Sequence, residues 1–222
     1  MKDFDAVVFD MDGLIFDSER VGYICWSEVL AGYGVHEITE LYNACIGCSR
    51  VRTARLVREA LGEDFPFEEF IRKVLEIYTT RYGGGKMPIK PGAREILSWL
   101  KTKGKKTALA SSSGRETVVS LLGAAGLLEY FDGLVCGDMV TKSKPEPDIF
   151  LSACELLGTA PERTFAVEDS YNGIRAAARG GLRPVMVPDM LPATEEMRGL
   201  SEAVEDDLYG VIGYFAGNND SE

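Results

Sequence analysis

Five short apolar runs recur along the chain, and four of them are rich in valine or phenylalanine. Runs of this kind are typical of strands that are buried on both faces, as in a parallel sheet covered by helices. The predicted strands are residues 6–9, 107–110, 133–136, 164–167 and 183–187.

Segments with helical periodicity lie between these runs, and several of them end in glycine, as helix C-termini often do. The predicted helices of this part of the chain are residues 92–104, 114–126, 146–158 and 171–181. Strands and helices that alternate across short loops predict an α/β fold with a doubly wound, Rossmann-like parallel sheet.

The interval after the first strand breaks this alternation, because it contains only helical patterns. We therefore expect an inserted, all-helical domain over residues 17–83 and an α/β core formed by residues 1–16 and 84–222. The segment that returns to the core carries Gly83, Gly84 and Gly85, followed by Pro88. Glycines permit the backbone rotation that a hinge requires.

The composition favours a globular protein with a sizeable core, since 45% of the 222 residues are hydrophobic. No run approaches the roughly 20 apolar residues that span a bilayer, and the N-terminus does not resemble a signal peptide, so we expect a cytoplasmic protein without a membrane partner. A net charge of −11 disfavours nucleic acid as a partner. An anionic substrate would need local cations at its site. The oligomeric state is open, and a monomer is compatible with the sequence.

Cysteine and histidine limit the chemistry. The five cysteines are an odd, scattered set, which favours reduced thiols over a disulfide framework. Cys45 and Cys48 form a C-x-x-C pair without a second pair, so a structural zinc site is not expected, and a redox role is left open. The single histidine, His36, lies in a polar stretch and is expected at the surface, which disfavours Ser-His-Asp or Cys-His catalysis.

Polar residues follow several of the predicted strands. Asp10 comes after the first strand, Ser111 after the second, and Glu168 and Asp169 after the fourth, while Lys144 follows the third at a greater distance. Because ligands of open α/β sheets bind outside the carboxyl ends of the strands, these side chains are candidates to converge.

The residue types suit a phosphate and a hard cation. Asp10 and Asp169 are oxygen ligands of the kind that Mg²⁺ takes. Glu168 would support these ligands from outside the coordination sphere. Ser111 and the backbone N–H groups of residues 111–114, Ser112 included, would form an anion cradle before a helix. Lys144 would neutralise the charge that Asp10 and a phosphate bring together.

Four motifs in this order resemble those of the haloacid dehalogenase (HAD) superfamily of phosphohydrolases. They are "FDMDG", "ALASSS", "SKPEPDIF" and "VEDSYNGI". The resemblance covers the chain from residue 4 to about 190, and the helical insertion resembles the cap of the β-phosphoglucomutase-like subgroup.

The resemblance implies a role for each motif residue. Asp10 would be the nucleophile that accepts the phosphoryl group, and Asp12 the general acid and base. Ser111 and Lys144 would bind phosphate. Asp10 and Asp169 would hold Mg²⁺, and the backbone carbonyl of Asp12 would complete the metal site. The presence of Asp12 argues against the dehalogenases, because a halide leaving group needs no acid.

Three positions of the insertion bear on the substrate. Arg50 matches an arginine of a β-phosphoglucomutase cap loop that contacts a substrate phosphate, although a plain surface arginine is an equal alternative. Trp26 matches a cap aromatic, but core packing is the favoured interpretation. Gly22 stands where the mutases carry a histidine that is understood to couple sugar binding to Asp12. Without that histidine, water and not a sugar hydroxyl should accept the phosphoryl group.

The sequence therefore predicts a Mg²⁺-dependent phosphatase of a small phosphorylated metabolite, and the family resemblance favours a sugar phosphate. A phosphosugar mutase of the β-phosphoglucomutase type is the alternative. A catalytically silent protein that binds a phosphorylated metabolite is a further alternative, which the intact set of Asp10, Asp12, Lys144 and Asp169 disfavours.

Overall fold

The computed structural model describes residues 1–48 and 50–217, and the chain divides into two units. The core unit comprises Met1–Asp17 and Ile89–Glu222, and the helical unit comprises Ser18–Pro88. The sequence placed residues 17–83 in the helical unit. The contacts within the structure group Asp17 with the core unit and residues 84–88 with the helical unit.

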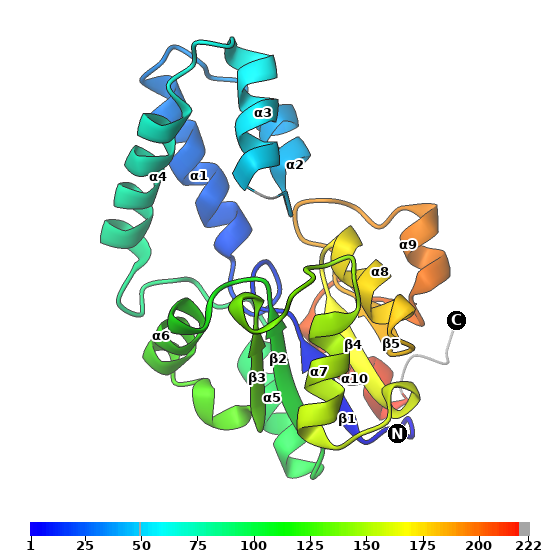
Figure 1. The fold of residues 1–222 in the computed structure, drawn as a ribbon. Helices are drawn as coiled ribbons and strands as arrows, with labels where there is room; N and C mark the ends of the chain where they lie inside the picture. The colour runs from blue at the N-terminus through cyan, green and yellow to red at the C-terminus, as the bar shows by residue number, and fades with distance from the viewer. Residues whose placement is uncertain (49, 218–222) are drawn as a thin grey trace. The chain divides into compact units, whose positions relative to one another are not determined.

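The core unit contains a parallel sheet whose strand order is β3-β2-β1-β4-β5-β6 (Figure 1). The strands are β1 (Ala6–Phe9), β2 (Lys106–Ser111), β3 (Gly133–Cys136), β4 (Thr164–Glu168), β5 (Arg183–Met186) and β6 (Ala203–Val204). The five predicted strands are β1 to β5, and the doubly wound α/β fold is confirmed. The chain first builds outward from β1 on one side and then returns to build on the other, so the strand order reverses at β1. Such a reversal creates the crevice where ligands bind in these folds.

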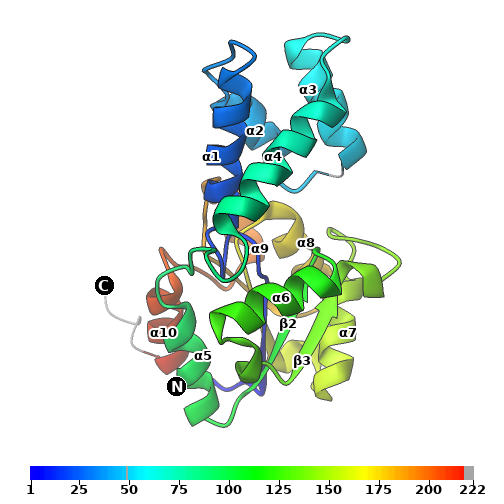
Figure 2. The same ribbon diagram turned by 90° about the vertical axis from the view of Figure 1, so that its left-hand side faces the viewer.

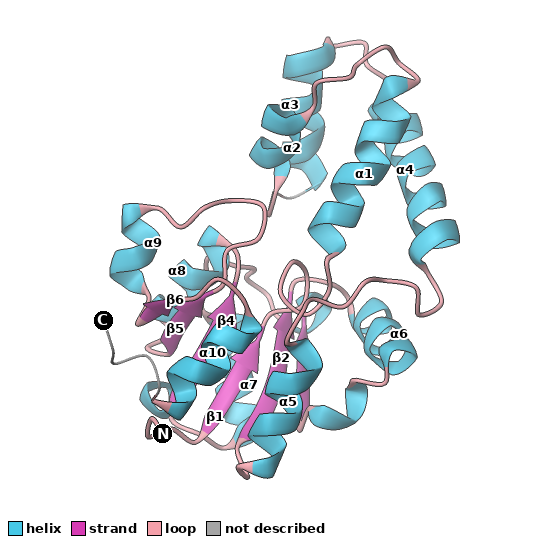
Figure 3. Cartoon of the chain, turned by 180° about the vertical axis from the view of Figure 1, so that it is seen from behind, coloured by secondary structure: helices cyan, strands magenta, loops and turns pink. Residues whose placement is uncertain are grey.

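Both faces of this sheet are covered by helices. These helices are α5 (Ala93–Thr102), α6 (Arg115–Ala125), α7 (Asp148–Leu157), α8 (Tyr171–Arg179), α9 (Glu195–Leu200) and α10 (Leu208–Ala216). Helices α7 and α8 lie on one face, and Figure 3 shows α5 and α10 in front of the other. The coverage on both sides explains why the strands read as apolar throughout.

Alternate residues of the strands supply two cores. On one face, Ala6 and Val8 of β1 pack with Ile149 and Phe150 of α7 in one buried cluster. The other face carries an aromatic cluster of Phe4, Phe165 and Phe215, in which the ring centroids of Phe165 and Phe215 are 4.7 Å apart. Burying a large side chain of this kind contributes roughly 1.5–3 kcal/mol. The central strand, which precedes Asp10, is therefore fixed from both sides.

The helical unit consists of α1 (Ser18–Ala31), α2 (Thr39–Cys45), α3 (Arg50–Leu61) and α4 (Phe67–Tyr82). Helix α1 packs along α4 and α2 along α3 (Figure 2). Trp26 is buried between Tyr42 and Phe70, with ring centroids 5.3 and 4.9 Å away, so it packs in the core of this unit as expected. His36 is exposed, also as expected.

The two chain crossings between the units are held together within the core unit. Phe16 and Ile89 form an antiparallel bridge, and Lys90 N–H donates to the Ile15 carbonyl over 2.9 Å. Among the described residues, the helices lack the length and apolarity that crossing a membrane requires.

Candidate active site

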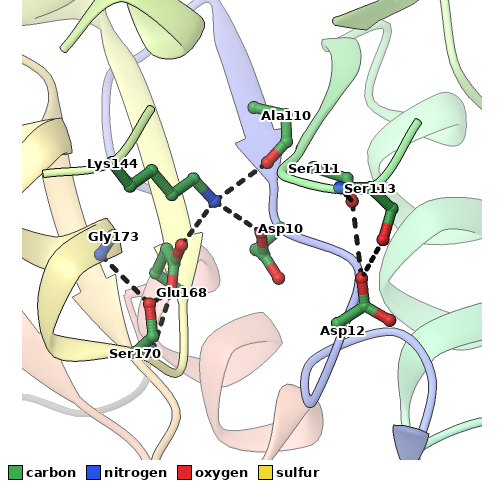
Figure 4. A network of polar contacts seen from close by, with 9 residues as sticks. All are labelled: Asp10, Asp12, Ala110, Ser111, Ser113, Lys144, Glu168, Ser170 and Gly173. Carbon is green, nitrogen blue, oxygen red and sulfur yellow. Dashed lines mark hydrogen bonds and ion pairs between the residues drawn. The ribbon is translucent and has the colours of Figure 1, made fainter. Parts of the chain in front are cut away.

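A single ammonium group joins the ends of three strands. Lys144 Nζ donates to Asp10 Oδ1 over 2.5 Å, to Glu168 Oε1 over 2.6 Å and to the Ala110 carbonyl over 3.0 Å (Figure 4). Asp10 follows β1, Glu168 ends β4 and Ala110 lies in β2. Because β1 pairs with both other strands, the sheet itself brings these groups together. The structure thus unites Asp10, Glu168 and Lys144 at the predicted edge.

The charges at this point do not balance. Lys144 brings one positive charge to two buried carboxylates, those of Asp10 and Glu168. Burial raises the pKa of Asp10 to about 7, and the neighbouring carboxylates of Glu168 and Asp12 add to the effect while Lys144 opposes it. Burial disfavours the ammonium of Lys144, but Asp10 and Glu168 overcome this and hold the pKa of Lys144 above its ordinary value. Asp10 is therefore only partly ionised at neutral pH, and a further cation would favour its ionised form.

Glu168 is held on both of its oxygens. Its Oε2 accepts hydrogen bonds from Ser170 N–H and Ser170 Oγ over 2.8 and 2.9 Å, while Oε1 faces Lys144. Ser170 Oγ also accepts from Gly173 N–H over 3.0 Å and so caps α8. A Cβ at Gly173 would lie 1.7 Å from Glu168 Oε1, which explains the glycine. These contacts make Glu168 an anchor for Lys144.

Asp12 is held by two serines instead of by the lysine. Ser113 Oγ donates to Asp12 Oδ2 over 2.9 Å, and Ser111 Oγ lies 3.5 Å from the same oxygen. Ser111 is fully buried, and its Oγ accepts from Ser113 N–H over 3.1 Å. Figure 4 shows the Asp12 side chain on the far side of Asp10 from Lys144. Asp10 and Asp12 therefore have different surroundings.

The serine turn supplies one contact that the sequence did not single out, from the Ser113 hydroxyl to Asp12. Ser112 is exposed, and phosphate binding by Ser111 and by the backbone N–H groups of this turn, Ser112 included, stays a prediction. The first backbone N–H of α6, on Arg115, is already bonded to the Asp138 carboxylate at 3.1 Å, so this end of the helix is partly satisfied. The run of three serines was the available signal, but it did not tell which hydroxyl points inward.

Asp169 follows Glu168 and is buried against the loop that follows β1. Gly13, with φ +82°, approaches it so closely that a Cβ there would lie 2.4 Å from Asp169 Oδ2. Glycine is required both for this backbone conformation and for this approach. The arrangement places the carboxylates of Asp10 and Asp169 at the ends of neighbouring strands, beside one loop.

These residues fit a magnesium ion. No cluster of three or more histidine, cysteine, aspartate or glutamate side chains suitable for a metal occurs within residues 1–48 and 50–217. Mg²⁺ is usually bound by only one or two protein carboxylates and keeps several waters. Two carboxylates, a nearby backbone turn and an excess of negative charge satisfy that requirement.

Arg50 and the pair of Cys45 and Cys48, which the sequence also singled out, lie in the helical unit. Arg50 begins α3, and its Nη2 pairs with Glu68 Oε2 at 2.5 Å on an exposed surface. Contact of Arg50 with substrate stays a prediction, and its neighbour at position 49 lies outside the described residues. Cys45 and Cys48 are free thiols, and burial raises the pKa of Cys45 to about 11, which opposes thiolate chemistry there.

The family model of the haloacid dehalogenase-like hydrolases matches residues 7–187. The chain belongs to this family. Protein CbbY of Cereibacter sphaeroides is 31% identical over 96% of each chain. A phosphorylated carbohydrates phosphatase of Thermotoga maritima is 33% identical over 82% of this chain and 83% of its own.

A solved structure supports the same family assignment. The crystal structure of a candidate β-phosphoglucomutase from Thermotoga maritima has a TM-score of 0.78 and 29% identity, and the match covers 95% of this chain and 98% of that one. The haloacid dehalogenase-like fold therefore extends over both units, and the chain is an enzyme of this hydrolase family.

Proposed function

We propose that this hydrolase is a Mg²⁺-dependent phosphatase of small phosphorylated metabolites, with sugar phosphates as the substrate class. The observation that carries the proposal is the division of the two aspartates, with Asp10 against Lys144 and Asp12 against Ser111 and Ser113. The phosphorylated carbohydrates phosphatase among the relatives supports the substrate class.

In the proposed reaction an ionised Asp10 oxygen attacks phosphorus, and the bond between phosphorus and the sugar oxygen breaks. Asp12 gives its proton to the departing oxygen, so an alcohol leaves and Asp10 carries the phosphoryl group. Water then attacks the phosphorus and loses a proton to Asp12, which releases phosphate and restores Asp10. Lys144 and the Ser111 turn would hold the phosphate oxygens during both steps.

Asp10, Asp169 and the Asp12 backbone carbonyl would hold the Mg²⁺. When bound, the ion would offset the excess negative charge and so favour the ionised form of Asp10. Asp12 is the proton donor of the proposed first step, and it contacts Ser111 and Ser113 on the side of Asp10 away from Lys144 (Figure 4). Two carboxylates with different surroundings are the arrangement that acid and nucleophile roles require.

Water is favoured over a sugar hydroxyl as the second acceptor because of position 22. A Cβ at Gly22 would lie 2.3 Å from the Tyr42 hydroxyl, so this space is taken in the helical unit. A histidine, which the mutases carry there, would require Tyr42 to move. This supports the phosphatase over the mutase.

The test is phosphate release from para-nitrophenyl phosphate and a panel of phosphorylated sugars. Activity should be lost in EDTA and return with Mg²⁺, whereas Ca²⁺ should inhibit because its looser coordination misplaces the phosphorus. Asp10→Asn should lower turnover by at least about a thousandfold without unfolding the protein. A variant that keeps more than a few per cent of the wild-type rate would contradict the nucleophile assignment.

The mutase alternative needs a separate experiment. The enzyme is incubated with β-glucose 1-phosphate, a trace of the 1,6-bisphosphate and Mg²⁺, and the products are followed by phosphorus NMR. We expect inorganic phosphate without isomerisation. Conversion to glucose 6-phosphate with little free phosphate would establish the mutase instead.

A further inference from the structure

One buried carboxylate near the site has an oxygen without a partner. Asp189 follows β5, and only 2% of its side chain is exposed. Its Oδ1 accepts from Lys90 Nζ over 2.6 Å. Its Oδ2 is buried and has no hydrogen-bond donor in the part of the chain that the structure describes. A buried acceptor of this kind is costly unless something outside the protein chain donates to it.

This oxygen lies beside the proposed cation site. A Cβ on Gly13 would lie 3.3 Å from Asp189 Oδ2 and 2.4 Å from Asp169 Oδ2. The two carboxylate oxygens therefore face the same point of the loop after β1, and their separation cannot exceed the sum of these distances. Strand pairing gives the reason, because Met186 of β5 lies opposite Glu168 of β4, so the residues that follow them leave the sheet at the same edge.

The charges around Asp189 indicate the kind of donor that its Oδ2 requires. Lys90 Nζ pairs with Asp189 Oδ1 and also lies 3.6 Å from Asp17 Oδ1. Its one positive charge is therefore shared between two carboxylates. A buried carboxylate oxygen such as Asp189 Oδ2 needs positive charge or a polarised donor beside it. A magnesium ion keeps several of its waters, and each is a strong donor directed away from the ion.

We propose that Asp189 is a positioning residue for the cation, with its Oδ2 accepting a hydrogen bond from a water bound to the Mg²⁺ that Asp10 and Asp169 hold. The inference rests on the proposed function, since it requires that ion. Lys90 fixes the carboxylate by its other oxygen, so that Oδ2 points toward the site. Outer contacts of this kind fix the orientation of metal ligands.

The alternative is that Asp189 serves only as the partner of Lys90. Asp189→Asn distinguishes the two roles. Its amide oxygen still accepts from Lys90, but an NH₂ group replaces Oδ2 and cannot accept from a bound water. Glu202→Gln is the matched control, because Glu202 pairs with Arg183 at 2.7 Å and lies before β6, at the opposite end of the sheet. Like Asp189→Asn, Glu202→Gln removes one negative charge.

The readout is the Mg²⁺ dissociation constant by isothermal titration calorimetry on the full chain, without substrate. We expect Asp189→Asn to bind Mg²⁺ about 10- to 100-fold more weakly, with Glu202→Gln close to wild type. The Mg²⁺ concentration for half-maximal phosphatase activity should rise by the same factor, which a loss of stability alone would not produce. Circular dichroism checks the fold, and Asp189→Ser replaces the Asn variant if that fails to fold.

The outcomes separate this inference from the proposed function. If wild type binds Mg²⁺ and Asp189→Asn binds within about threefold of it, Asp189 is only a partner of Lys90 and the inference is wrong. If Glu202→Gln weakens binding as much as Asp189→Asn, the effect is general electrostatics and the inference is again wrong. If wild type itself binds no Mg²⁺, the metal-dependent function fails first.

Discussion

Ser113 donates a hydrogen bond from Oγ to Asp12 Oδ2 over 2.9 Å. The contact joins the turn after β2 to the loop after β1, and it aims the carboxylate that the proposed reaction uses as acid and base. Its partner residue Ser111 accepts from Ser113 N–H, so the two serines and Asp12 form one small network. In the proposed reaction, Ser113 would therefore act through Asp12.

Removing this hydroxyl should weaken turnover without unfolding the protein. A lost hydrogen bond costs roughly 0.5–1.5 kcal/mol, so we expect Ser113→Ala to lower kcat by roughly two- to tenfold. Ser112→Ala is the matched control, because Ser112 is the exposed neighbour in the same turn. Steady-state kinetics on para-nitrophenyl phosphate measure both. Equal effects of the two substitutions would show that Ser113 has no special role.

The stability of the metal-free protein should depend on the ionisation of Asp10. Its pKa is raised from the ordinary 3.8 to about 7, so the folded state binds this proton more tightly than the unfolded chain does. The stabilisation is complete below pH 3.8 and is lost as the pH rises through about 7. In EDTA, the melting temperature of wild type should fall relative to that of Asp10→Asn across this range.

Magnesium should reduce this pH dependence, because a bound cation favours the ionised carboxylate. Melting curves of wild type and Asp10→Asn, each with EDTA or with Mg²⁺, give the four comparisons needed. Parallel pH profiles of the two proteins in EDTA would contradict the raised pKa.

A glycine in α8 should be intolerant of a methyl group. Gly173→Ala would place its Cβ 1.7 Å from Glu168 Oε1, so the anchor of Lys144 must shift. We expect a loss of roughly 1–3 kcal/mol in the free energy of unfolding, with a loss of phosphatase activity. In contrast, Gly123 in α6 has no atom within 4 Å of a built Cβ, and Gly123→Ala should stabilise the protein by roughly 0.5–1 kcal/mol. Urea denaturation measures the free energy of unfolding of both variants. Equal changes in the two would contradict a specific clash between position 173 and Glu168.

A double-mutant cycle tests the packing of Tyr42 over Gly22. Gly22→Ala should destabilise the helical unit, because its Cβ would meet the Tyr42 hydroxyl at 2.3 Å. Tyr42→Phe removes that oxygen, but it also loses the hydrogen bond to the Glu19 carbonyl at 2.8 Å. The double variant should therefore be more stable than the sum of the two changes implies, by about 0.5–3 kcal/mol. Additive effects would show that the two residues are not coupled.

The parts of the fold that the sequence predicts are those with a local physical signal. The strands before Asp10, Ser111 and Glu168 are apolar because both faces of the sheet are covered, so their ends could be located directly. Strand β6 has only two residues, Ala203 and Val204, and such a short segment has no pattern of its own. Its place depends on pairing with β5.

The parts of the site that were missed depend on contacts between distant segments. Ser113 follows β2 and contacts Asp12, which follows the neighbouring strand β1. The conformation of the turn decides which of the three adjacent serines makes this contact. Lys90 and Asp189 meet only because the segment that returns from the helical unit passes the loop after β5. Asp189 does follow a predicted strand, so its position at a strand end was a usable signal.

The bridge between Phe16 and Ile89 has a consequence for how the family can diversify. The two ends of the helical segment leave and rejoin the core unit side by side. The geometric requirement on the segment is therefore that its two ends lie close together. For a flexible segment joining the same two ends, each doubling of length would raise the entropic free-energy cost of closure by only about 0.6 kcal/mol. We therefore expect Ser18–Pro88 to be exchangeable as a unit for the corresponding segment of a relative, with the sheet and the bridge between Phe16 and Ile89 unchanged.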